Sequence, residues 1–258
     1  MSLITARTDR ITVKLKELSI RSLIRMAAMP ADAEHQLTTI MLESAIDSVE
    51  SGPEDPADWT VAERIYVKCQ YMAATLESGP DFIVSSSEKT PSKLSDYLQG
   101  ERDYKAPFVD VGMFDDQKLI VRHLTGRLAE SIERVLGAID DLGDLGKWEV
   151  GMMAAQLVEA EGFTEPSTES MLDQLILERI NRLLDMDTLS FLKAYQLWRI
   201  GFEKLQHLVY LSASVNDGLV CLGTGGKAGT VPPARFPVDT IIPDFTYRMA
   251  GKPAPVSA

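Results

Sequence analysis

The sequence predicts a mainly helical α+β fold with a small β element, and three observations lead to this prediction. Apolar residues recur every three or four positions over several long stretches, as they do in helices that bury one face. One early stretch instead alternates apolar and polar residues, which is typical of a half-buried strand. The 258 residues are 45% hydrophobic, which is enough for a packed core.

The N-terminal part combines this strand with three helices. Residues 11–18 alternate apolar and polar side chains and predict the strand. Ser19 can cap the helix that we expect over residues 20–29, because its hydroxyl can accept a hydrogen bond from a free main-chain N–H. Helical spacing of apolar residues predicts a second helix over residues 37–49 and a third over residues 59–76.

The middle of the chain is less regular. Residues 81–112 mix a short apolar run with Ser-rich and Pro-containing stretches, so we expect short strands or loops there. Residues 118–124 fit either a strand or a helix. A small sheet that packs against helices is the expected result.

Four clear helical patterns follow in the second half of the chain. Each repeats apolar residues every three or four positions, and Gly- or Asp-containing breaks separate them. They cover residues 127–136, 147–160, 168–184 and 189–211. We therefore expect a helical bundle or array in this half.

The composition changes after about Ser212. The glycines of residues 223–229 and several prolines cannot sustain a long helix, so we expect an irregular, extended tail. The predicted organisation is thus an N-terminal segment over residues 1–112, a helical domain over residues 113–211 and a C-terminal tail over residues 212–258.

The predicted tail carries recurring apolar groups, and such groups need a surface to cover them. Two destinations are open. The tail can fold back on its own domain, or it can dock on a neighbouring subunit. The candidate partner-binding residues are Phe236, Ile241, Ile242, Phe245 and Tyr247.

The charge of the chain argues against some partners. A net charge of −12 disfavours a protein that grips phosphate backbones, because such binding needs clustered Lys and Arg, so we expect no nucleic acid. We expect no membrane insertion and no secretion by a signal peptide, because no apolar run has the length and flanks that either requires. The two cysteines, Cys69 and Cys221, have apolar surroundings and are expected to be free buried thiols.

Motifs for nucleotides and metals fail on their context. Residues 223–228 fit the glycine pattern of a dinucleotide-binding loop, but two prolines follow and leave no helix to receive a pyrophosphate. The histidines lack a second histidine or cysteine at ligand spacing, which argues against a zinc site. These histidines are His35, His123 and His207. We expect no cofactor and no metal.

We also expect that the protein is not an enzyme, because no catalytic motif is recognisable. Carboxylates are abundant, but their order does not fit a calcium-binding loop. The rival hypothesis is an enzyme whose site is assembled from scattered residues. Its candidate residues are Asp115, Asp140, Asp144 and His123.

The N-terminal arrangement carries a resemblance to a known class of proteins. The alternating residues 11–20, followed by a helical stretch with Leu23, Ile24, Met26 and Leu37, resemble the opening of small phage tail-assembly and baseplate-associated proteins. Such proteins often begin with an alternating strand and continue into an acidic helical body. The resemblance covers roughly the first fifty residues by pattern and the rest by composition, and it transfers no binding site.

The resemblance implies a non-enzymatic tail or baseplate component that acts in virion assembly or structure through protein–protein contacts. Its partners would be other phage tail or baseplate subunits, in an oligomer or a larger assembly, located in the virion or the host cytoplasm. Two roles are open, a chaperone that covers a sticky surface before assembly and a permanent subunit of the particle. The alternative is an acidic helical adaptor for one partner protein.

Overall fold

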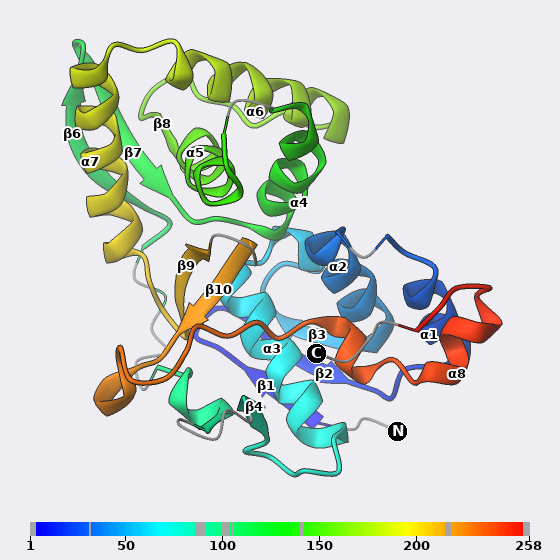
Figure 1. The fold of residues 1–258 in the computed structure, drawn as a ribbon. Helices are drawn as coiled ribbons and strands as arrows, with labels where there is room; N and C mark the ends of the chain where they lie inside the picture. Colours follow the sequence, from blue (N-terminus) through cyan, green and yellow to red (C-terminus); the bar gives the residue numbers. More distant parts are fainter. Residues whose placement is uncertain are drawn as a thin grey trace.

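The chain forms two lobes, one above the other in Figure 1. The computed structural model describes residues 4–30, 32–85, 91–99, 104, 106–139, 142–214 and 218–254. The terminal lobe contains the first and the last described residues, and the middle lobe is built from residues 106–139 and 142–204. The described residues form eight α-helices and ten β-strands in small sheets, which confirms the predicted mainly helical α+β class.

A three-stranded antiparallel sheet begins the terminal lobe. Its strands, in spatial order, are β1 (Ile4–Arg7), β2 (Thr12–Leu15) and β3 (Ile46–Ser51). The strand predicted from the alternating residues is therefore confirmed over β2, where Val13 and Leu15 are fully buried. Residues 16–18 lie beyond the strand.

The third strand corrects the second predicted helix, which ends at Ala45 and not at Val49. Ile46 pairs with Leu15, and Val49 pairs with Val13. The two residues on β3 are three positions apart in the sequence, whereas their partners on β2 are only two positions apart. An irregularity in the pairing absorbs the extra residue. A bulged strand therefore shows the same apolar spacing as one turn of helix.

The described part of the terminal lobe contains four α-helices, and two of them begin with local capping side chains. The four helices are α1 (Ile20–Ala27), α2 (Glu34–Ala45), α3 (Val61–Thr75) and, near the C-terminus, α8 (Asp244–Met249). Ser19 caps α1 as predicted, because its Oγ accepts a hydrogen bond from the N–H of Ser22 at 3.1 Å. At the start of α3, Thr60 and Glu63 form a reciprocal capping box.

Short strands occupy the middle of the chain, as predicted. A two-stranded pair is formed by β4 (Ile83–Ser85) and β5 (Ser92–Lys93), and a three-stranded sheet by β6 (Phe108–Phe114), β7 (Gln117–Arg122) and β8 (Leu157–Glu159). Residues 118–124, whose pattern fitted either a strand or a helix, therefore belong to strand β7 as far as Arg122. Asp115 and Asp116 have φ values of 45° and 64°, which suit the tight turn of the β6–β7 hairpin.

Four helices fill the middle lobe, and all four were predicted. They are α4 (Gly126–Val135), α5 (Asp144–Gln156), α6 (Glu169–Leu184) and α7 (Thr188–Lys204). Two predicted ends are wrong. Residues 157–159 leave α5 to pair with β7, and Leu208 has a φ of 61°, which no α-helix accommodates.

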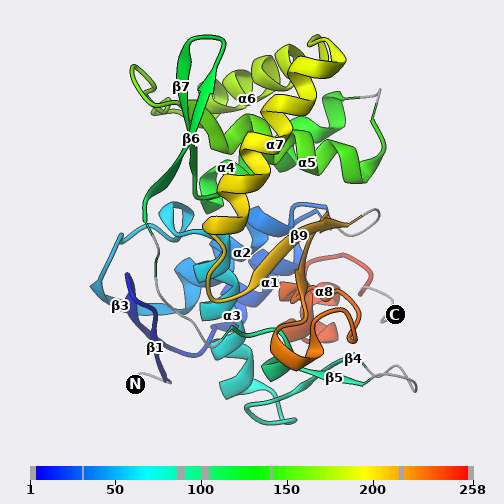
Figure 2. The same cartoon turned by 90° about the vertical axis from the view of Figure 1, so that its left-hand side faces the viewer.

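The last part of the chain covers its own lobe. β9 (Tyr210–Ser214) and β10 (Gly218–Leu222) form a hairpin, and Figure 2 shows α7 running down from the middle lobe into β9. The chain then crosses the terminal lobe in short turns, and α8 packs beside α1. The predicted boundaries after residues 112 and 211 fall inside β6 and β9, so neither lies in a linker.

Short 3₁₀ helices complete the connections. They are η1 (Pro56–Asp58), η2 (Leu94–Asp96), η3 (Leu136–Ala138), η4 (Gly225–Lys227) and η5 (Val238–Ile241). The glycine-rich residues that resembled a dinucleotide-binding loop form η4 and its flanks, and no α-helix follows them directly in the described chain. The structural context that such a loop needs is therefore absent from this segment.

Candidate functional site

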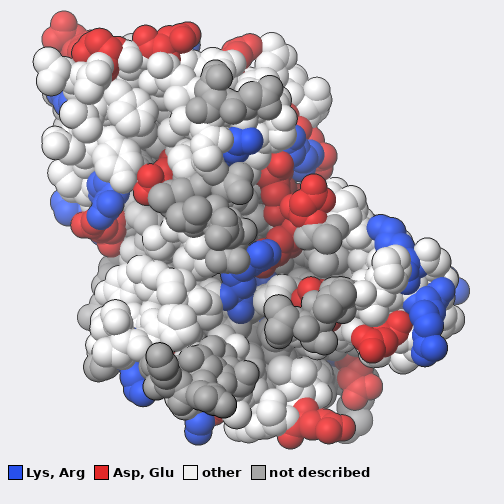
Figure 3. Space-filling model, viewed as in Figure 1, with Lys and Arg blue, Asp and Glu red and all other residues white. Residues whose placement is uncertain are grey.

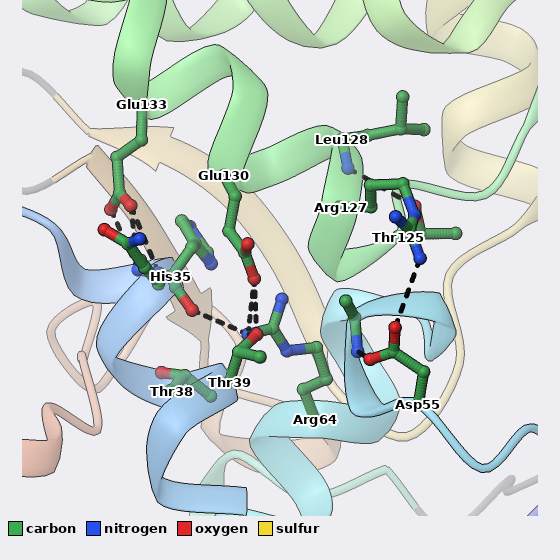
Figure 4. Close-up of polar contacts among 12 residues, drawn as sticks. His35, Thr38, Thr39, Asp55, Arg64, Thr125, Arg127, Leu128, Glu130 and Glu133 are labelled. Carbon is green, nitrogen blue, oxygen red and sulfur yellow. Dashed lines mark hydrogen bonds and ion pairs between the residues drawn. The ribbon is translucent and has the colours of Figure 1, made fainter. Parts of the chain in front are cut away.

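A buried polar cluster joins the two lobes, and Figure 4 shows it in detail. Arg64 of α3 lies at its centre with a side chain that is 1% exposed. Its Nη2 donates hydrogen bonds to the carbonyl of His35, at 2.6 Å, and to Thr39 Oγ1, both on α2. Glu130 of α4, in the other lobe, lies 3.4 Å from the same nitrogen and accepts a hydrogen bond from Thr39.

Glu133 of α4 caps α2 from the opposite lobe. The residue before α2, Ala33, has no side chain that can accept a hydrogen bond. Instead, the carboxylate of Glu133 accepts hydrogen bonds from the main-chain N–H groups of His35, at 2.9 Å, and Gln36, at 3.4 Å. Burial raises the pKa of Glu133 to about 7 in spite of these bonds, which oppose the shift.

Main-chain contacts and a glycine bring α4 close to α3. The N–H of Gly126 donates to the carbonyl of Trp59 at 2.9 Å, and the N–H of Val61 donates to the carbonyl of Leu124 at 2.8 Å. A Cβ on Gly126 would lie 1.8 Å from Nη1 of Arg64. The guanidinium can therefore occupy this position only because residue 126 has no side chain.

A second cluster at the junction is made of rings. Tyr104 lies on the chain segment that enters the middle lobe, and His207 lies on the segment that leaves it. The Tyr104 ring stacks on His123 with centroids 4.6 Å apart, and the two histidine rings meet edge to face at 5.0 Å. His123 Nε2–H donates to the carbonyl of Ala106 at 2.8 Å.

The environment of His123 keeps its ring neutral. Burial is the main cause that lowers its pKa, to about 4, and the neighbouring His207 lowers it further. Within the described ranges, no three side chains of the His, Cys, Asp and Glu types converge as a metal site would require.

The structure places the residues of the enzyme hypothesis in different surroundings. Asp115 lines a cavity of about 260 Å³ between the β6–β7 hairpin, α5 and α6, whereas His123 faces a separate cavity of about 20 Å³. Asp140 lies outside the described residues. Asp144 is the first residue of α5, and its side chain also lies outside them. Asp115 and His123 therefore do not share one pocket.

One of the cations that line the larger of these two cavities is half-buried and has a structural role. Arg179 of α6 donates from Nε to the carbonyl of Ala154 at 2.6 Å and from its guanidinium to the carbonyl of Leu157. These carbonyls lie at the end of α5, so Arg179 closes that helix. Burial and the nearby cations Arg122 and Arg182 lower the pKa of Arg179 to about 10, which leaves it charged at neutral pH.

The five candidate partner-binding residues lie mostly inside their own lobe. Phe236, Ile242 and Tyr247 are buried, and the Phe236 ring packs edge-on against Tyr97 and Phe82. Ile241 is partly buried, and Phe245 is 40% exposed. In this structure the tail therefore folds back on its own lobe. Of the five candidate residues, Phe245 is the most exposed to solvent.

An exposed apolar surface lies on α7, where the sequence predicted only a bundle helix. We define the α7 surface by Leu189, Leu192 and Ile200, which are 78%, 48% and 48% exposed. The opposite side of α7 packs on the β6–β7 hairpin, and Gly201 there contacts Val121 closely. In Figure 3 uncharged side chains cover much of the left side of the upper lobe, charged side chains of both signs lie at its lower left, and acidic side chains follow the upper edge of the molecule.

A signal for this surface exists in the sequence. Residues 189–211 hold apolar residues on more than one side of the helix, and a helix that is apolar all round must be covered on every side or leave one side exposed. Further exposed apolar side chains, Phe108 and Met113, lie on β6.

Comparison of the chain with protein-family models, with curated proteins and with solved structures finds no match. None of the helices in the described residues is long and apolar enough to cross a membrane.

Proposed function

We propose that the chain is a non-enzymatic protein-interaction component of a phage tail or baseplate. One observation carries the interaction role, namely the α7 surface. The spacing of Leu189, Leu192 and Ile200 places them on one side of α7, where they are 78%, 48% and 48% exposed. A partner that covers this surface would remove apolar area from water, which is the main driving force of association.

The assignment to a phage tail or baseplate rests on the N-terminal resemblance. Strand β2 is followed by α1 and α2 in the order that this resemblance implies. The net charge of −12 supports the interaction role, because mutual repulsion keeps copies of a chain with an exposed apolar strip apart. A partner therefore has to offer apolar contact without a strongly acidic surface.

Native mass spectrometry on the chain recovered from its own source tests the proposal. The wild-type chain is expected to carry other polypeptides in a fixed stoichiometry. A triple variant, Leu189→Gln, Leu192→Gln and Ile200→Gln, is expected to lose them, because it removes the apolar contacts without adding charge. The control is Met113→Gln, which changes an apolar residue on β6 that is 55% exposed, and it should retain the partners.

Each outcome has a distinct meaning. Partners within a large particle support a structural subunit, and a transient complex with one polypeptide supports the chaperone or adaptor role. A chain recovered alone from its source contradicts the proposal. Partner binding that survives the triple variant contradicts the assignment of the α7 surface.

A further inference from the structure

A small chamber lies inside the terminal lobe between α2, α3 and β10. Its volume is about 20 Å³, which is room for one water-sized or monatomic guest. The walls include three basic side chains, Arg64 and Lys68 of α3 and Arg235 of the segment after β10. Arg64 and Lys68 are 1% and 2% exposed, so both are shielded from solvent.

The positive charges in this chamber exceed the carboxylates that pair with them. Arg64 pairs with Glu130, and Arg235 pairs with Glu34. Lys68 has no ion pair within the described part of the chain, and its Nζ makes one long hydrogen bond, 3.3 Å to Thr38 Oγ1. The Glu34 carboxylate lies in the same walls and favours the charged form of Lys68, but its ion pair is with Arg235, so the lysine is left without an ion pair of its own among the described residues.

Two N–H donors in the same walls also have no acceptor in the described part of the chain. Nε of Arg64 and Nε of Arg235 are buried and make no hydrogen bond within the described residues. A buried donor without an acceptor is costly, so both favour a guest that can accept hydrogen bonds. The chamber thus combines an excess of charge with an excess of donors.

The remaining titratable group in the walls cannot balance this charge. The ring of His35 is buried, and the charges of Arg64, Lys68 and Arg235 add to that burial in lowering its pKa well below the usual value. All three cations line the same chamber as this ring. Cys221 also lines the chamber, and burial raises the pKa of its thiol to about 12, so it supplies no negative charge at neutral pH.

We propose that the chamber binds one monatomic anion, such as chloride, beside Lys68. Loss of the lysine proton would remove the charge, but it would leave the guanidinium donors without acceptors. A water molecule could accept hydrogen bonds, but it would leave the charge. A chloride ion supplies both a negative charge and an acceptor, and the volume of about 20 Å³ excludes sulfate, phosphate and carboxylates.

Thermal unfolding of the full chain in sodium chloride and in sodium gluconate, at equal ionic strength, tests the proposal. Gluconate is too large to enter the chamber. Because a ligand that binds only the folded state stabilises it, the unfolding midpoint is expected to rise by about 5 °C, and to saturate, as chloride replaces gluconate. Sodium bromide is expected to replace chloride in this effect.

The matched variants are Lys68→Met, which keeps the length of the side chain without its charge, and Lys193→Met on the surface of α7. The chloride dependence should vanish in Lys68→Met and persist in Lys193→Met. If Lys68→Met does not fold, crystals of the wild-type chain grown in bromide decide, because bromide in the chamber gives an anomalous scattering peak. Any of three results would overturn the proposal. The unfolding midpoint does not change with chloride, the chloride dependence persists in Lys68→Met, or the chamber holds only water in crystals grown in bromide.

Discussion

The two buried contacts between the lobes use opposite physical means. The Arg64 cluster joins α3 and α2 to α4 through ions and charge-assisted hydrogen bonds. The ring cluster of Tyr104, His123 and His207 joins the two crossing segments through stacked and edge-to-face rings. Charged groups make the contact in the first cluster, whereas in the second the low pKa of His123 keeps its ring neutral, and the Arg10 guanidinium lies over the Tyr104 ring, 5.0 Å from its centroid.

This difference predicts how strongly the stability of each contact depends on a single residue. A buried ion pair repays the cost of desolvation only while every partner is present, so loss of one partner leaves a charge that nothing compensates. A neutral ring contact loses mainly packing when one ring is changed, typically about 0.5–1.5 kcal/mol beyond the buried area. We therefore expect the Arg64 cluster to be the more sensitive of the two junctions.

The largest effect is expected from Arg64→Met. This change leaves Glu130 buried without a cation and removes the bonds to α2, and we expect a loss of about 3–5 kcal/mol in the free energy of unfolding. The measurement is denaturant-induced unfolding followed by circular dichroism.

The double variant Arg64→Met with Glu130→Leu separates the ion pair from general packing. It should recover most of the loss, because both charges are then gone. As a surface control, Arg199→Met breaks an exposed pair with Glu203 four residues away and should cost about 0.5 kcal/mol or less. Equal losses for Arg64→Met and Arg199→Met would contradict the buried-charge account.

The parts of the fold that depend on local sequence could be predicted. The capping of α1 by Ser19 needs only neighbouring residues, and the four helices of the middle lobe follow from apolar spacing along each segment. The places where prediction failed depend on distant partners. β3 exists because β2 is available to pair with it, and β8 exists because β7 has a free edge.

The site was harder to predict for the same reason. Arg64 and Lys68 lie four residues apart in a helix that was predicted from its apolar residues alone, and no local pattern marks either cation as buried. Burial on every side of α3 follows from its contacts with α2 and α4, and Glu130 is 66 residues from Arg64. For the tail, the sequence left two destinations open for Phe236, its own lobe or a neighbouring subunit, and in this structure Phe236 packs on Tyr97 of its own lobe.

A smaller effect is expected from Gly126→Ala, which perturbs the same cluster without removing a charge. The new Cβ would lie 1.8 Å from Arg64 Nη1, so the guanidinium has to move away from Thr39 and Glu130. We expect a loss of about 1–3 kcal/mol in the free energy of unfolding. Gly137→Ala is the matched control, because a Cβ there meets no atom within 4 Å, and it should have no such cost. Equal effects of the two substitutions would show that the close approach at Gly126 is not maintained in solution.

The smallest effect is expected from pH, and it has opposite signs in the two clusters. Glu133 has a folded pKa of about 7 against an ordinary value of 4.5, so the folded chain binds more protons and its stability falls as the pH rises through this window. His123 has a folded pKa of about 4 against 6.5, so the unfolded chain binds more protons and stability falls as the pH drops through that window. The two contributions, each about 1–2 kcal/mol after allowance for solvent screening, largely cancel in the wild-type chain.

Variants that remove one group at a time should expose these opposite slopes. In Glu133→Gln the neutral amide can still accept from the N-terminus of α2, and the free energy of unfolding should rise with pH between 4.5 and 6.5. In His123→Phe the stack on Tyr104 is kept, and the free energy of unfolding should rise less with pH, or fall, over the same range, because Glu133 is no longer opposed. Denaturant unfolding of the three chains at pH 4.5, 5.5 and 6.5 measures both slopes. The same pH dependence in both variants would mean that neither group is desolvated at the junction as the structure places it.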